Sequence, residues 1–161
     1  MTNEDHQSVE SRHHSTVDSD RFTAALHLHR GGTSVVLDMS ASPHPVIVHW
    51  GEELVDSTPE TLRSLVVGAR PQRVSGGLDE TPRLGLVATP AAGWLGTPGA
   101  EGHRNGSGGS LRLEVAGVQA NGHRATISLI DVEARIAADV ELRVGPGGLF
   151  HQRILLRNDG N

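Results

Sequence analysis

The chain of 161 residues is long enough for one ordinary domain with an aliphatic core, because it holds only two Trp, two Phe and no Tyr. It has no Cys, which excludes a disulfide framework and a thiolate metal site. It also has neither an apolar stretch of about 18 residues nor a signal peptide, so we expect a cytoplasmic protein that contacts no membrane. The net charge is −5, most of it in residues 1–20, and the nearly neutral remainder argues against nucleic acid as a partner.

Residues 1–20 are polar, charged and without periodicity, so we expect a disordered acidic tail there and one domain over residues 21–161. The domain begins with RFTAALHLHR, in which Phe22, Leu26 and Leu28 fall on one face at a period of two. The runs TSVVLDM and PVIVHW follow after turn residues. These three runs predict three strands of an antiparallel meander.

The stretch DSTPETLRSLVVGARP predicts one short helix. Ser57 with Glu60 three residues later forms a capping box, Pro59 suits the first helical turn, and Gly68 ends the segment. Residues 71–109 are rich in Pro and Gly and have no sustained period, so they predict a long irregular loop. A loop of that length inside a compact domain is usually functional or an interface.

Four β-rich runs follow from Ser110: SLRLEVAGVQ, HRATISLIDV, EARIAADVELRV and LFHQRILLRND. Asn121-Gly122 is a preferred pair for a two-residue type I′ turn, and GPGG at 145–148 predicts another turn. Every second residue from Val132 to Val144 is apolar, so one face of that strand is expected in the core. Seven strands with short connections predict an all-β fold, an antiparallel β-sandwich with one short helix and a long irregular loop.

Two histidines at the spacing His27-x-His29 share one side of the first predicted strand, a spacing that metal-binding β-barrels use. Because Leu26 and Leu28 define the buried face, both imidazoles are expected to point to solvent with a structural role. A His-dependent β-barrel metalloenzyme is therefore the least favoured alternative. No motif for a serine nucleophile or a phosphate loop occurs, and we expect neither a cofactor nor a metal site.

Glycoside hydrolysis requires two carboxyl groups on either side of the scissile bond. The acids Glu133, Asp139 and Glu141 are expected on the solvated face of a strand. Asp79 lies in the irregular loop, where it is either a turn-forming residue or a binding group. No catalytic residue is assigned.

The irregular loop also contains Trp94 and Arg104. A Trp in a Gly/Pro-rich loop can stack on a sugar, fill a subunit contact or plug the end of a sandwich, and for Trp94 these alternatives stay open. Trp50 is expected to be such a plug. Arg104 can hold a carboxylate through two hydrogen bonds, or it is an ordinary exposed loop residue.

Five stretches together resemble the N-terminal region of bacterial α-galactosidases of glycoside hydrolase family 36. They are VHWG at 48–51, the helix TPETLRSLVVGARP, GGLDETP at 76–82, GWLGTPGAEGHRNG at 93–106 and the closing FHQRILLRNDG. The resemblance covers about residues 21–161 and implies a β-supersandwich domain, incomplete here, followed by a (β/α)₈ barrel. Both catalytic Asp residues of that family belong to the barrel, which takes about 250 residues, and no residue of this chain matches either motif.

The resemblance further implies a role in assembly. In tetrameric members a loop of this domain reaches the active-site mouth of a neighbouring subunit, and Leu78 and Asp79 in GGLDETP occupy the matching place, with Trp94 close behind. These residues and Arg104 are therefore candidates for the rim of the active site or for an interface, and Asp79 is expected to accept hydrogen bonds from a sugar hydroxyl or an Arg. The full-length enzyme would be a homo-oligomer that acts on α-galactosides.

The sequence thus predicts a non-catalytic N-terminal domain or fragment of a retaining α-galactosidase, which alone would hydrolyse nothing. The alternative is a stand-alone carbohydrate-binding or assembly module with the same β-sandwich fold.

Overall fold

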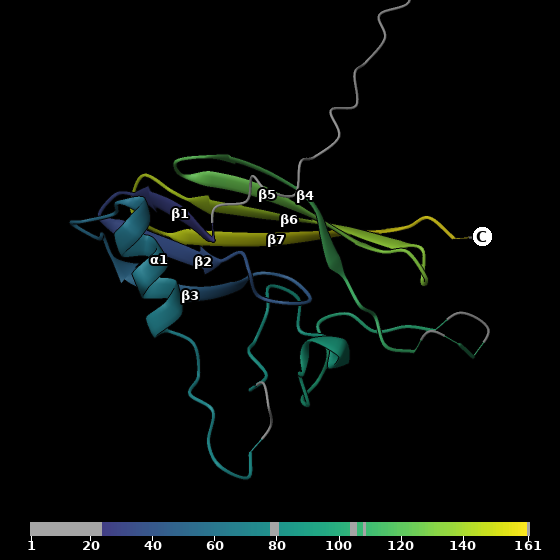
Figure 1. Cartoon of the computed structure of the whole chain (residues 1–161). Coiled ribbons are helices and arrows are strands. Elements are labelled where there is room, and N and C mark those ends of the chain that lie inside the picture. Colours follow the sequence, from purple (N-terminus) through teal and green to yellow (C-terminus); the bar gives the residue numbers. More distant parts are fainter. Residues whose placement is uncertain (1–23, 78–80, 104–105, 108, 161) are drawn as a thin grey trace, which may run out of the picture.

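A computed structural model describes residues 24–77, 81–103, 106–107 and 109–160 (Figure 1). This part of the chain forms two antiparallel sheets, one α-helix and one short 3-10 helix, so the predicted mostly β fold is confirmed. The expected acidic tail, residues 1–20, and Phe22 lie outside the described residues. No helix in the described ranges is long and apolar enough to cross a membrane.

The first sheet is a three-stranded meander of β1 (Ala25–Arg30), β2 (Thr33–Asp38) and β3 (Val46–Glu52). The β1–β2 turn consists of Gly31 and Gly32 with φ of 60° and 76°, a conformation that glycine adopts without steric cost. The predicted face of the first strand is confirmed at Leu26 and Leu28, since Leu28 is buried in the main hydrophobic core and the partly buried Leu26 packs against it.

Helix α1 (Pro59–Gly68) covers the other face of this sheet, where Leu62 and Val66 pack against Val36 (Figure 1). Its N-cap is Thr58, whose Oγ1 accepts a hydrogen bond from the backbone N–H of Thr61 at 3.3 Å. The prediction that Ser57 caps the helix is therefore wrong by one residue. With Thr58 as the cap, Pro59 occupies the first helical position, where a missing N–H costs no hydrogen bond.

This assignment predicts that Thr58→Ala lowers the free energy of unfolding by about 1 kcal/mol, the usual cost of losing an N-cap hydroxyl. Ser57→Ala is the matched control and should leave the free energy of unfolding unchanged. Urea denaturation of both variants measures the difference. A larger loss in the Ser57 variant than in the Thr58 variant would refute the assignment.

Between α1 and the second sheet the chain is largely irregular, as predicted, and contains only the short helix η2 (Pro90–Ala92) among the described residues. This irregular segment does not lie only on the surface. Leu86, Val87 and Ala100 are buried in the main core. The backbone N–H of Leu86 donates to the Pro45 carbonyl at 3.1 Å, which attaches the segment to the start of β3.

The second sheet has four strands in sequence order: β4 (Glu114–Asn121), β5 (Arg124–Asp131), β6 (Ile136–Val144) and β7 (Phe150–Asn158). In the β4–β5 hairpin Asn121 pairs with Arg124, so the two loop residues are Gly122 and His123. The predicted Asn121-Gly122 turn is wrong by one residue because Gly122, with φ of 53°, takes the first loop position. The turn at 145–148 is confirmed.

The third predicted β-run begins later than its alternation suggested. Residues 132–135 form a turn, in which the backbone N–H of Ala134 donates to the Asp131 carboxylate at 2.8 Å. Val132 is 79% exposed, so the prediction that it faces the core is wrong. The strand itself begins at Ile136, and burial alternates from Ala138 to Val144.

The two sheets pack face to face through one hydrophobic cluster. It joins Leu28, Val35 and Leu37 of the first sheet to Ile127 and Val140 of the second. Burial of one such side chain contributes roughly 1.5–3 kcal/mol, so this layer between the sheets is a major source of stability.

Candidate functional site

Three of the four predicted site residues, Leu78, Asp79 and Arg104, lie outside the described residues. Their predicted roles at a rim or interface remain predictions. Trp94 is described and follows directly after η2 and Gly93.

The ring of Trp94 is folded back on its own loop. Its indole N–H donates to the Thr97 carbonyl at 2.7 Å, and the ring lies so close to Gly96 that a Cβ at that position would meet it at 2.8 Å. The side chain is 36% exposed. Because the indole N–H is already used within the loop, only the ring surface remains to contact a sugar or a subunit.

Trp50 does not plug the sandwich as predicted, since it is 63% exposed. Its ring packs at a tilt of 59° against Phe150 of β7, with the ring centroids 5.4 Å apart. Ile154 and Leu156 of β7 lie opposite the core residues Val140 and Ala138 of β6 but are themselves partly exposed. We call Trp50, Phe150, Ile154 and Leu156 the open edge, because these inner-face side chains are incompletely covered.

His27 and His29 stack with their ring centroids 4.8 Å apart. His29 is exposed, as predicted, and its Nδ1 lies 3.0 Å from Glu53 Oε1. His27 is half-buried, contrary to the prediction, because its Nε2 bonds to the buried hydroxyl of Ser34 at 2.8 Å. Burial and then the neighbouring His29 lower the pKa of His27.

The metalloenzyme alternative finds no geometric support at this pair. Within the described ranges no three His, Asp or Glu side chains are placed to hold a metal ion. The hydrogen bond of His27 to Ser34 ties β1 to β2, and that of His29 to Glu53 ties β1 to the residue that follows β3.

The described residues include two buried carboxylates, Asp38 and Asp131, and both are used by hydrogen bonds within the fold. Asp131 accepts the backbone N–H groups of Arg112 and Ala134, each at 2.8 Å. Asp38 accepts from Arg83 Nη2 at 2.7 Å and from the backbone N–H of Ser40 at 2.9 Å. These contacts give both carboxylates structural roles.

Asp38 is the centre of an anchor for the irregular segment. Arg70 donates to the Ser40 hydroxyl at 2.9 Å and its Nε lies 3.8 Å from Asp38, while Arg83 reaches the same carboxylate from the segment after α1. The Nη1 atom of Arg83 is buried without a hydrogen-bond partner in the described part of the chain. Two arginines that follow α1 in the sequence, Arg70 and Arg83, are thus held at the end of β2.

A hollow of about 410 Å³ lies where the irregular segment meets the start of β6 and the end of β7. Its apolar wall is formed by Leu111, Ile136 and Leu156, and Glu101 and His103 supply polar groups. Sequence reasoning missed this hollow because its walls come from segments far apart in the chain.

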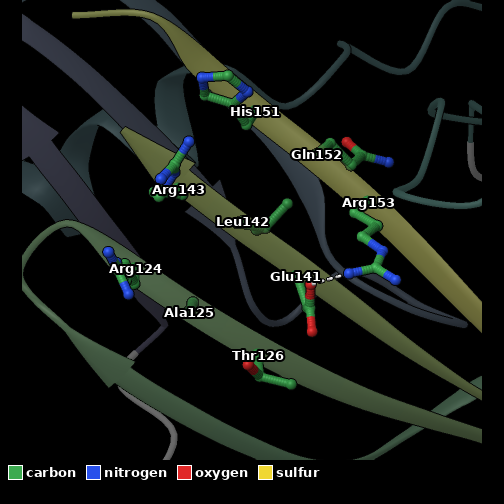
Figure 2. A pocket seen from close by; sticks show the side chains of 9 residues that line it. All are labelled: Arg124, Ala125, Thr126, Glu141, Leu142, Arg143, His151, Gln152 and Arg153. Atoms are coloured by element: carbon green, nitrogen blue, oxygen red, sulfur yellow. Dashed lines mark ion pairs between the residues drawn. The ribbon is translucent and has the colours of Figure 1, made fainter. Parts of the chain in front are cut away.

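A second hollow, of about 480 Å³, lies over β5, β6 and β7 (Figure 2). It carries the cationic side chains of Arg124, Arg143 and Arg153 together with the imidazole of His151. Glu141 is the single acidic residue among the described residues that line it. Of these side chains, only Glu141 was predicted from the sequence to lie on a solvated face, and the strand register brings the arginines and His151 beside it.

Two packed antiparallel sheets and a covering helix define a mostly β protein of the sandwich type. Over 122 residues the chain is 32% identical to an α-galactosidase of Escherichia coli; the matched part is 76% of this chain and 17% of that relative. The chain therefore spans a small part of the relative's length. No family model and no solved structure matches the chain.

Proposed function

We propose that this chain is the non-catalytic N-terminal domain, or a part of it, of a retaining α-galactosidase of glycoside hydrolase family 36. The observation that carries the proposal is the 32% identity to an α-galactosidase over 122 residues, which make up 17% of that relative. In this role the domain helps to assemble a cytoplasmic homo-oligomer, and Leu78, Asp79, Trp94 and Arg104 contribute to the rim of the active site.

The open edge supports a role within a larger assembly. Trp50 is 63% exposed and more than half of Leu156 is exposed, although both belong to inner faces of the sandwich. Large apolar side chains that gather at the surface commonly mark a contact with another protein surface. We propose that the rest of the enzyme covers this edge.

The second candidate is a stand-alone carbohydrate-binding module. The hollow beside β7 favours it, because apolar walls with a few polar groups are typical of small-molecule sites. Titration of the isolated chain with an α-galactoside disaccharide, followed by NMR, separates the two candidates. Saturable shifts at Glu101 and Ile136 would favour the module.

The proposed domain role is tested with a hybrid enzyme. We expect this chain alone not to hydrolyse a chromogenic α-galactoside, and we expect deletion of the matched segment from the E. coli relative to abolish its activity. Replacing that segment with residues 24–160 of this chain should restore turnover. Hydrolysis by the isolated chain, or a soluble hybrid as inactive as the deletion variant, would contradict the proposal.

The same hybrid tests the open edge. Leu156→Ser should lower its activity or its degree of assembly, because a polar group would then face the apolar contact. Val55→Ser is the matched control, since Val55 is fully exposed and lies outside the open edge. Equal behaviour of the two variants would show that the open edge makes no such contact.

A further inference from the structure

A group of basic side chains, three arginines and one histidine, lies on the outer face of the second sheet. The strand register places Arg124 of β5 directly opposite Arg143 of β6, and Arg143 directly opposite His151 of β7. Arg153 lies in the next row, opposite Glu141 (Figure 2). We call Arg124, Arg143, His151 and Arg153 the basic hollow.

Most of this positive charge is not neutralised by the fold. Arg153 Nη1 lies 3.7 Å from Glu141 Oε2, the one ion pair within the hollow. In the described part of the chain neither Arg124 nor Arg143 takes part in an ion pair. Like charges directly opposite each other destabilise a sheet, so this arrangement has an energetic cost that a bound anion would relieve.

The pKa of a neighbouring histidine, His123, is affected by the same arginines. Desolvation, followed by the charges of Arg30, Arg124 and Arg143, lowers the pKa of His123 in the β4–β5 hairpin. Arg30, at the end of β1, therefore adds to the positive charge around His123. The local charge is positive in a chain whose net charge is −5, so general surface charge does not account for it.

We propose that the basic hollow binds a phosphate-type oxyanion, either free or as the phosphoryl group of a larger molecule. The planar guanidinium groups of Arg124 and Arg143 present paired donors that match phosphate oxygens. The hollow of about 480 Å³ leaves space beside the anion for the rest of a small ligand. The hydroxyl of Thr126 is a further donor. Thr126 lies directly opposite Glu141, which in turn lies opposite Arg153.

The test is a titration of the full chain with inorganic phosphate, followed by backbone amide NMR at low salt, with chloride at equal ionic strength as the reference. We expect saturable shifts confined to the strands around Arg124, Arg143 and His151, with a dissociation constant on the order of 1 mM. Arg143→Gln should weaken binding about tenfold, which corresponds to about 1.4 kcal/mol. Arg124→Gln provides a second variant with the same expectation.

Arg112→Gln is the matched control. Arg112 is exposed, pairs with Glu114 at 2.8 Å and precedes β4, near the Asp131 end of β5 and away from the hollow. This variant should bind phosphate as the wild type does. Shifts that do not saturate, or an affinity that both hollow variants leave unchanged, would overturn the proposal.

A second arm of the titration identifies the source of the phosphoryl group. A hexose phosphate that binds more tightly than inorganic phosphate would indicate a phosphorylated sugar, and equal affinity would indicate the free anion. An acidic peptide that shifts the same amides when phosphate does not would overturn the proposal in favour of a protein partner.

Discussion

Asp38→Ala is expected to lower the free energy of unfolding by about 3 kcal/mol, the lower end of the cost of breaking a buried ion pair, because the Arg83 side chain that loses its partner is 22% exposed. Asp38 is fully buried and accepts hydrogen bonds from Arg83 Nη2 at 2.7 Å and from the Ser40 backbone N–H. The substitution leaves the Arg83 guanidinium without a carboxylate, and one nitrogen of that group is already buried and unpartnered. The irregular segment should then lose its attachment to β2.

Denaturant unfolding measures this loss, and hydrogen exchange reports where the structure loosens. We expect faster exchange at Leu86 and Val87, which follow Arg83 in the chain. Asp159→Ala is the control, because its ion pair with Arg157 is exposed and such pairs contribute about 1 kcal/mol or less. A similar loss in both variants would show that the buried anchor does not hold the segment.

Acid should remove the same contribution in the wild type. Burial raises the pKa of Asp38, but hydrogen bonds from Ser40 and Arg83 outweigh it, so the pKa lies below the ordinary value of 3.8. A lowered pKa in the folded state gives stability that is present above pH 3.8 and is lost as the pH falls through the folded value. The stability difference between the wild type and Asp38→Asn should therefore be constant near neutrality and shrink below pH 3.8.

The anchor shows a limit of sequence reasoning. Period-two alternation predicted the strands, since Leu26 and Leu28 must share a face whatever surrounds them. The pairing of Asp38 with Arg83 joins positions 45 residues apart, and no local pattern indicates it. A buried charge pair is visible only once the segments that carry it are in place.

The errors at turns have a shared cause. The sequence indicates a turn by residue type, but the register is set by which residues pair, and Asn121 pairs with Arg124 instead of occupying the turn. At Val132 the apolar alternation continues into a turn because Asp131 bonds to the backbone of Ala134. Local patterns therefore located the elements more reliably than their ends.

The candidate sites differ in how much of each could be predicted from the sequence. Trp94 was identified by its residue type and loop context, and the structure adds that its indole N–H is used by Thr97. The basic hollow was not predicted, although alternation already places Arg124 and Arg143 away from the core. The feature that identifies it is that Arg124 and Arg143 lie opposite each other on paired strands, and this can be recognised only when the strand register is known.

Ile127→Ala should cost about 2–5 kcal/mol of unfolding free energy, because the side chain is fully buried between the sheets and its removal leaves a cavity. Val132→Ala is the control, since 79% exposure predicts a change within about 0.5 kcal/mol. Sequence alternation alone would assign both residues to the core, so the comparison distinguishes the observed sandwich from the predicted strand pattern. Thermal unfolding followed by circular dichroism measures both variants, and a loss at Val132 as large as that at Ile127 would mean that the turn at 132–135 is wrongly placed.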